Sequence, residues 1–346
     1  MLWFVFVRSP KTGQRDAAMI ALSLGICSEI GSLKLLCMLI YIKKIRKLTD
    51  DFRDFDAQMV PDSRLYKNLL KYLRTAKKRA MTYWSFMAGN GVLFMTKHFI
   101  IPEHLTQDSF VLYGLEPMNE SPNFEISSIM MVFGVSLIIA ISATVTTYFI
   151  VMTGYAESQL LALSEELLHL WEDAELHCET VMAQEPGVTD ERFRRQRIMN
   201  EHVFNSLRRI IPHHAVIKKF FEQLREVFKW SIAIGLFLLL LGVICVLLGG
   251  IENTYMQLPF GMLLVGLDCY IGQRMKDANV VFEQAVYDCG WENFNKENMK
   301  MVLVMLQNAQ SIAAISAGDF VDVDYICLMA TMKATYSTYT AFRSSI

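Results

Sequence analysis

The sequence predicts an all-α fold: a polytopic transmembrane helical bundle with cytoplasmic helical extensions. The 346-residue chain is 53% hydrophobic and only 20% charged, whereas soluble domains are about 25% charged. Ile126–Ala156 contains no Asp, Glu, Lys, Arg or His over 31 residues, and Trp230–Ile251 contains none over 22. Because a helix needs about 20 apolar residues to cross a bilayer, each of these two stretches can span one.

Six segments are predicted to span the membrane, and three of them carry charges inside the span. In chain order the segments are Ala17–Ile42, Ala80–Pro102, Ile126–Tyr155, Lys229–Ile251, Thr254–Met275 and Phe320–Phe342. The internal charges are Glu29 and Lys34 in the first, Asp268 in the fifth, and Asp322, Asp324 and Lys333 in the last. Because charge facing lipid is costly, these three helices are expected to line the bundle interior or a watery path.

The segments between the spans predict amphipathic helices that continue out of the membrane. Apolar residues recur at spacings of three and four in Gln159–Leu170 and Ala215–Trp230, the period of one helical face. Phe193–Ile211 is a basic helix, which Pro212 is expected to interrupt, since an internal proline removes a backbone hydrogen bond. Val280–Trp291 continues the fifth span. With no membrane to cover them, these faces are expected to pack on each other or on a neighbouring subunit.

One further stretch is apolar enough to resemble a span. Met301–Gly318 is uncharged over 18 residues but includes Gln307, Asn308 and Gln310. We interpret it as a partly polar helix that packs against protein and precedes the last span.

The basic residues predict the topology. The segment Lys43–Arg79 holds twelve Lys and Arg, Glu157–Lys229 ten and Arg274–Lys300 four, whereas Glu103–Glu125 holds none. Basic connections stay in the cytoplasm, so Glu103–Glu125 is predicted to lie outside. Within it, Asn119 starts an N-x-S sequon and is a candidate glycosylation site.

The charge also limits the partners. Arg192, Arg194, Arg195 and Arg197 form a cluster that we interpret as a surface facing lipid headgroups. The formal net charge is −2, which provides no basic footprint for nucleic acid. Membrane lipid is therefore predicted as a partner, and nucleic acid is not.

The N-terminus raises a question of completeness. Six spans in this topology place both chain ends outside, and Met1–Val7 is too short to span and lacks a signal-peptide layout. We therefore expect a chain that lacks most of a first span, with Met1–Val7 as the exit end of that span.

Catalytic constellations are missing from the sequence. It has no Walker A loop, GxGxxG, HExxH, GxSxG or CxxC pattern, so we predict no enzyme, no cofactor and no metal centre. His169 and His177, with Glu172 and Glu175 between them, could share a helix face and hold a metal, but a solvated helix is the preferred interpretation. Asp268 could serve as a proton or ion relay, or as a charge at a helix end.

The C-terminal third resembles the insect odorant receptors, a family of seven-span odorant-gated channels. The resemblance rests on Cys269-x-x-Gly272, on Ala285-x-Tyr287-x-Cys289-x-Trp291, on Lys300 to Gln310 followed by Ala317-Gly318-Asp319-Phe320, and on Lys333-Ala334-Thr335-Tyr336-Ser337-Thr338-Tyr339. Upstream, His214-x-x-Ile217 is similar to the family's His-x-x-Ile before its fifth helix. Position 338 is Thr where an aromatic is more usual, and the long second cytoplasmic loop of the shared co-receptor is absent. The chain therefore resembles a tuning receptor.

The resemblance implies an architecture. The family forms tetramers, generally with the co-receptor, that sit in the plasma membrane of sensory dendrites. It implies a remnant of the first span and outer loop (1–16), the second to fourth transmembrane helices (17–158), a cytoplasmic helical anchor (159–228), the fifth and sixth helices (229–275), further anchor helices (276–318) and a pore-lining last helix (319–346).

The resemblance also implies site residues. A volatile odorant is expected to bind in the outer half of the bundle, against Ile30, Leu33, Met87, Asn90, Met131 and Val135. The pore is expected to be lined by Thr335, Thr338, Tyr339 and Phe342, with a constriction near Tyr339. Anchor and subunit contacts are expected from His214, Ile217, Tyr287 and Trp291.

Two other functions stay open on the sequence. A gustatory receptor of the same superfamily shares the fold and a terminal Thr-Tyr pattern, although the block ending at Trp291 favours an odorant receptor. A secondary transporter belongs to a different class and predicts internal repeats with broken helices, and no such duplication is found.

Overall fold

The computed structural model describes residues 3–13, 15–57, 59–100, 114–115, 120–184, 191–249, 257–311 and 314–345. Within these ranges the chain is helical apart from short connections and one two-stranded hairpin, which confirms the predicted all-α class. The first half contains the turns η1 (Phe4–Arg8) and α1 (Ser9–Thr12), then α2 (Arg15–Ile40), α3 (Ile42–Ala57), α4 (Arg64–Ile100), α5 (Asn123–Leu168) and α6 (Leu170–Gln184). The second half contains α7 (Glu191–Leu248), α9 (Gln257–Tyr287), η2 (Trp291–Asn293), α10 (Lys296–Ala309), β1 (Ser316–Ala317), β2 (Val321–Asp322) and α11 (Tyr325–Ser345).

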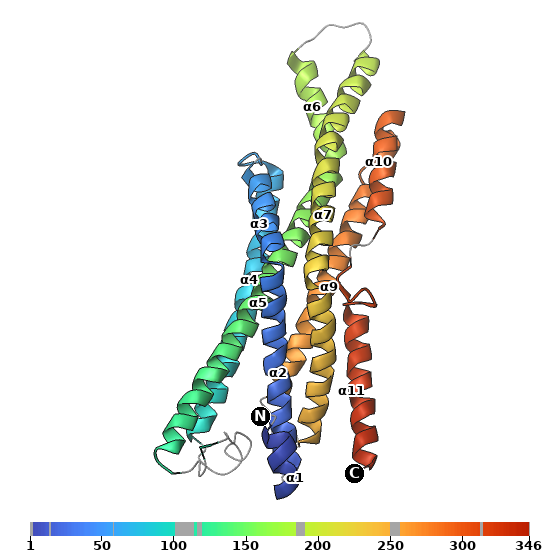
Figure 1. Ribbon diagram of the computed structural model, residues 1–346. Helices are drawn as coiled ribbons and strands as arrows, with labels where there is room; N and C mark the ends of the chain where they lie inside the picture. The colour runs from blue at the N-terminus through green and yellow to red at the C-terminus, as the bar shows by residue number, and fades with distance from the viewer. Residues whose placement is uncertain are drawn as a thin grey trace.

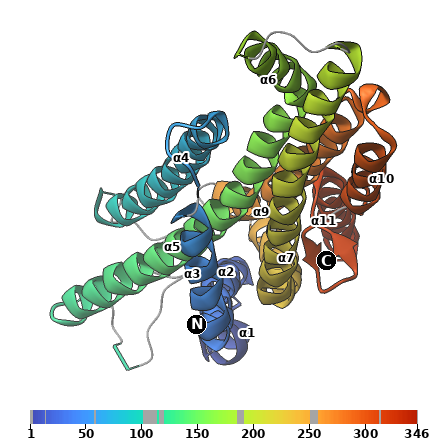
Figure 2. The same cartoon turned by 90° about the horizontal axis from the view of Figure 1, so that it is seen from above.

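The long helices run along one axis of the molecule. At the lower end of Figure 1, α2, α7, α9 and α11 stand side by side, while α4 and α5 lean away as an antiparallel pair. The upper end holds α6, the first half of α7, and α10 beside α9. Figure 2, looking down this axis, shows the same division between the α4–α5 pair and the rest. The molecule thus has a membrane-sized lower bundle and an upper helical region that continues from it.

Three described helices are long and apolar enough to cross a membrane: α2, α5 and α7. Helix α5 contains the third predicted span, and α2 and α7 contain most of the first and fourth. The second, fifth and last predicted spans fall in α4, α9 and α11, which do not meet that criterion. All three run beside the apolar helices in the lower bundle, so neighbouring helices cover part of their surface.

The structure overturns the predicted break at Pro212. Helix α7 continues from Glu191 to Leu248 with Pro212 inside it. A proline removes one hydrogen bond to the carbonyl four residues earlier. Pro212 is exposed, so solvent can satisfy that carbonyl, and packing on both sides holds the helix together.

The connection into the last helix also differs from the expectation. The predicted helix over Met301–Gly318 ends at Ala309, and the last helix starts at Tyr325, later than the predicted Phe320. Between them β1 pairs with β2 in an antiparallel hairpin. Gly318 and Asp319 both have a φ of 60°, a left-handed conformation that a helix cannot contain.

Glycine lets the helices approach closely at several crossings. A Cβ on Gly31 of α2 would lie 2.4 Å from Ser142 Oγ of α5, and one on Gly154 of α5 would lie 2.8 Å from the Ala76 Cβ of α4. The tightest crossing is at Gly272 of α9, where a Cβ would lie 1.7 Å from the Val323 carbonyl oxygen. Backbone there occupies the space of a side chain, so α9 and the start of α11 are held in direct contact.

Replacing Gly272 by Ala should separate α9 from the segment before α11. Overpacking of this kind costs about 1–3 kcal/mol, so the purified protein should melt at a lower temperature. Gly266→Ala is the matched control, because Gly266 also lies in α9 and its Cβ would meet nothing within 4 Å. Equal melting temperatures for the two variants would contradict the close crossing.

Candidate ligand, pore and anchor sites

The predicted ligand residues lie on α2, α4 and α5, and two of them are fully packed. Ile30 is 3% exposed and Met87 is 0% exposed, and both belong to the main hydrophobic core. A Cβ on Gly235 of α7 would lie 4.0 Å from Ile30 Cγ2, so Ile30 is directed towards α7. The others are half-buried on the same three helices: Leu33, Asn90, Met131 and Val135.

A buried ion pair joins two of the predicted spans. Lys34 Nζ on α2 lies 3.0 Å from Asp268 Oδ2 on α9, and both side chains are 8% exposed. Lys34 is one turn from Ile30, so the pair adjoins the candidate ligand residues. Charges inside a membrane bundle normally pair with one another. The sequence had left Asp268 as a relay or a helix-end charge, and the structure shows it paired with Lys34.

A second cluster ties three helices together where the predicted spans meet the upper helical region. Glu157 of α5, whose side chain is 3% exposed, accepts a bond of 2.9 Å from Arg79 of α4 and a bond of 2.5 Å from Arg274 of α9. Each arginine stands at the inner end of a predicted span. The sequence analysis did not single these residues out. The sequence signal that could have identified this cluster is one acidic residue and two arginines, each at the inner end of a different predicted span.

The hairpin before α11 is fixed to α7. Asp319 accepts bonds from Arg225 (2.8 Å) and Lys229 (2.7 Å), and the Gly318 amide donates to the Lys229 carbonyl at 3.0 Å. Asp324 then caps α11, since its Oδ1 accepts from the Ile326 and Cys327 amides at 2.9 and 3.0 Å. The inner end of α11 is therefore rigidly placed against its neighbours.

The predicted pore residues differ in their surroundings. Thr335 is 5% exposed, and its hydroxyl donates to the Thr331 carbonyl. Thr338 and Tyr339 are half-buried. The side chain of Phe342 lies outside the described residues. Elsewhere α11 exposes apolar and aromatic side chains: Ile326 (75%), Met329 (54%), Met332 (43%) and Tyr336 (69%).

Of the predicted anchor residues, two are packed inside the chain and two are on its surface. His214 stacks on Phe282 of α9, with ring centroids 4.4 Å apart, and Ile217 is 2% exposed. Tyr287 and Trp291 are 58% and 38% exposed. The first two therefore hold α7 and α9 together, and the last two are available to another chain.

Beside His214, a polar network joins three helices. His213 Nε2 donates to Gln159 Oε1 at 2.9 Å, and Gln159 Nε2 lies 2.7 Å from the Tyr155 hydroxyl, which donates to Asp56 of α3. Burial lowers the pKa of His213 to about 4 and that of His214 to about 4. Both imidazoles are thus neutral at pH 7.

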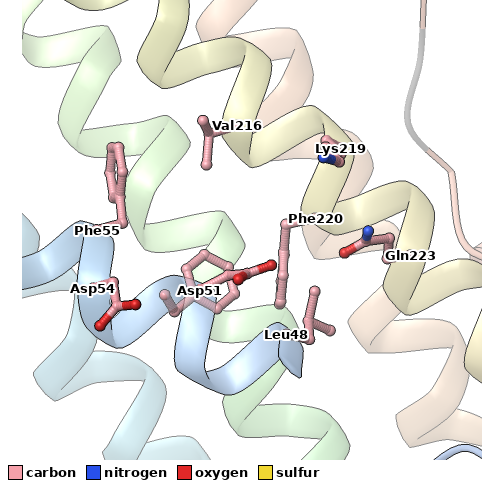
Figure 3. A pocket seen from close by; sticks show the side chains of 9 residues that line it. Leu48, Asp51, Asp54, Phe55, Val216, Lys219, Phe220 and Gln223 are labelled. Atoms are coloured by element: carbon pink, nitrogen blue, oxygen red, sulfur yellow. The ribbon is translucent and has the colours of Figure 1, made fainter. Parts of the chain in front are cut away.

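A cavity of about 280 Å³ lies between α3 and α7, in the upper half of the molecule (Figure 3). Leu48, Phe52 and Phe220 provide its buried apolar wall, and Asp51 and Lys219 stand at its exposed rim. None of the predicted ligand residues lines it.

The remaining predicted sites are the glycosylation candidate and the histidines considered for a metal. Asn119 lies outside the described residues. His169 pairs with Glu172 at 2.9 Å, and the rings of His177 and His202 are tilted against each other, with centroids 4.6 Å apart. In the described ranges no group of three or more His, Cys, Asp or Glu is placed to hold a metal ion.

Comparison with known proteins places the chain in a known group. Residues 15–336 match a family model described as 7tm Odorant receptor. The structure of the insect olfactory receptor OR5 from Machilis hrabei superposes with a TM-score of 0.71 at 14% identity, over 94% of this chain and 81% of that chain. The same receptor in complex with eugenol superposes with a TM-score of 0.69 at 14% identity, over 96% and 82%. These likenesses show a shared transmembrane helical fold. No curated protein sequence matches the chain.

Breaking the buried pair between α2 and α9 should be costly only when one charge remains. Lys34→Met or Asp268→Leu alone should destabilise the receptor by about 3–5 kcal/mol, because an unpaired charge stays buried. The double variant should recover most of the loss, since apolar residues of similar volume can replace a buried ion pair. Thermal melts of the four purified receptors measure this. Additive losses in the double variant would show that the two residues do not interact.

Acid should destabilise the α7 region through its neutral histidines. Below pH 6.5 an unfolded histidine binds a proton that buried His213, with its pKa of about 4, does not. Stability is therefore lost as the pH falls, by about 2 kcal/mol for one such histidine at pH 5. His213→Gln should reduce the drop in melting temperature between pH 7.5 and 5. His169→Gln, at a site 44% exposed, is the control and should leave the drop unchanged. A drop of the same size in all three proteins would contradict the assignment.

Proposed function

The chain belongs to the 7tm odorant receptor family, and from that membership we propose that it is a tuning subunit of an odorant-gated cation channel. It is an odorant receptor with a multi-pass transmembrane fold, and its family is one of receptors rather than enzymes. The proposed channel is a hetero-tetramer with a co-receptor in the plasma membrane of sensory dendrites. The family match favours this function over a gustatory receptor or a secondary transporter.

The proposed ligand is a small volatile molecule held in the bundle by α2, α4 and α5. Support comes from Ile30 and Met87, which these helices bring into one apolar core, with Asn90 as a half-buried polar neighbour of that core. Leu33, Met131 and Val135 complete the proposed wall. Sites of this kind are mostly apolar with few polar anchors. The receptor that shares this fold was solved with eugenol, and we expect a ligand of similar size here.

The proposed pore helix is α11. The observation that carries this proposal is the row of exposed apolar side chains from Ile326 to Tyr336 on a helix whose described side chains are mostly exposed, because in a bilayer that face needs lipid or another subunit. We propose that Thr338, Tyr339 and Phe342 line the pore, with the constriction near Tyr339. Thr335 is turned towards the bundle, so it would reach the pore only if α11 rotates on opening.

A continuous set of contacts supports coupling from ligand to pore. The Lys34–Asp268 pair joins α2 to α9, and the crossing at Gly272 joins α9 to the start of α11. A ligand that fits the open arrangement better than the closed one shifts the population towards it. We propose that α11 then moves outward.

The proposed assembly uses the upper, cytoplasmic helices. Tyr287, Trp291, Leu303 and Val304 are exposed there by 58%, 38%, 55% and 52%, and such apolar surface is expected to be covered in the assembled receptor. The proposed anchor contacts between subunits are Tyr287 and Trp291, while His214 and Ile217 stabilise the fold behind them.

The test is current recording from cells that express the chain with a co-receptor, under a panel of volatiles. An odorant-evoked cation current is expected, and Tyr339→Ala should change its ion permeability or conductance because it widens the constriction. Thr338→Ala and Phe342→Ala should act in the same direction. The control is Val280→Ala, an exposed cytoplasmic position in α9. A robust current whose permeability none of the α11 changes alters would overturn the pore assignment. No current with any volatile would overturn the channel.

A further inference from the structure

Two cysteines meet where α9 crosses the start of α11. Cys269 of α9 is 0% exposed and Cys327 of α11 is 8% exposed. The two side chains are near enough to interact with each other. Both are free thiols in this structure. Neither has a part in the proposed ligand site or pore.

The contact belongs to a set of pairings between two antiparallel segments. At its inner end Lys276 Nζ lies 3.1 Å from Asp324 Oδ2. One turn along α9, Gly272 packs against the Val323 carbonyl so closely that a Cβ would lie 1.7 Å from the oxygen. Cys269 is three residues before Gly272, and Cys327 is four residues after Val323, so the next pairing in the series is between the two thiols.

The contacts at Asp324 and Gly272 hold the backbone of α11 against the backbone of α9, and so position the two cysteines. Asp324 caps α11 and so sets the position of the Cys327 amide, which donates to Asp324 Oδ1 at 3.0 Å. A disulfide requires the sulfurs to come within about 2.05 Å of each other. Since the two side chains already interact, the proposed closure is a movement of side chains.

We propose that Cys269 and Cys327 are a redox-sensitive pair that closes to a disulfide between α9 and α11. The co-reactant is a small hydroperoxide, such as hydrogen peroxide, which is neutral and small enough to approach Cys327, the more exposed of the two at 8%. The Cys327 sulfur attacks one peroxide oxygen and the O–O bond breaks. One water is released, and Cys327 becomes a sulfenic acid. The Cys269 sulfur then attacks that sulfur, forms the S–S bond and releases a second water. Two thiols are oxidised, and one hydrogen peroxide is reduced to two waters.

The disulfide would fix α11 to α9 at its inner end. This consequence rests on the proposed function, in which α11 moves when the channel opens. The oxidised receptor should therefore give a smaller odorant-evoked current, and a thiol reductant should restore it.

The chemical test does not depend on channel activity. The full chain, purified with its co-receptor in detergent, is treated with hydrogen peroxide, and its free thiols are then alkylated. Mass spectrometry of a non-reduced digest should find the peptides of Cys269 and Cys327 joined, with the loss of two hydrogen atoms. Cys269→Ser and Cys327→Ser should each abolish that species, whereas Cys245→Ser in α7 should leave it. Absence of the joined peptide under peroxide would overturn the proposal, as would a cross-link from Cys269 to a different cysteine.

The functional test uses the same variants in cells. Peroxide should reduce the current of the parent receptor and of Cys245→Ser, and should leave Cys269→Ser unaffected. If the disulfide forms but the current does not change, the thiol pair stands and the movement of α11 is contradicted. If peroxide reduces the current of Cys269→Ser equally, the disulfide is not the cause of the effect. Surface expression of each variant, measured by labelling, separates loss of current from loss of folding.

Discussion

The arrangement of the spans depends on one buried carboxylate. Glu157 has a side chain only 3% exposed and lies between Arg79 and Arg274. Removing a carboxylate from water costs several kcal/mol unless charged donors surround it. Glu157 is therefore stable only when α4 and α9 bring both arginines to it. Three helices are fixed relative to one another where the apolar spans end, and the upper helical region continues from that point.

The other ion pairs extend this arrangement to the remaining helices. Lys34 and Asp268 connect α2 to α9 inside the bundle, and Asp319 connects the hairpin to α7. In a bilayer, lipid competes with apolar side chains for helix surfaces, so apolar packing alone specifies partners weakly. Buried charges specify them strongly, because a wrong partner leaves a charge unpaired. The few charges within the predicted spans thus select which helices pack together.

The sequence predicted what depends on local composition and failed where distant residues decide. The charge-free stretches in α5 and α7 are sufficient in themselves to predict spans. The partner of Lys34 is 234 residues away, and no periodicity contains that information. Two other regions show the same limit. At Pro212, packing along α7 keeps the helix continuous although the proline predicts a break. After Ala309, the left-handed conformations of Gly318 and Asp319 prevent the helix that the apolar run predicts. The ligand residues were placed on particular helices by resemblance, and their role in binding stays a prediction, with Ile30 and Met87 both in the main hydrophobic core. Which half-buried neighbours touch a ligand depends on how α4 and α5 lean against α2, which is a property of the whole bundle.

The last helix, α11, is held firmly at its inner end and is exposed along one side. Its inner end is held by a capping carboxylate, an ion pair to Lys276 and a backbone contact at Gly272, while its outer face shows Tyr336 at 69% exposure. A helix fixed at one end and uncovered along one side can pivot about the fixed end with little loss of packing. Displacement then grows with distance from Gly272, so Tyr339 moves further than Cys327. In the proposed channel, a constriction near Tyr339 would therefore respond to small shifts of α9, and α9 is paired with α2 through Asp268 and Lys34.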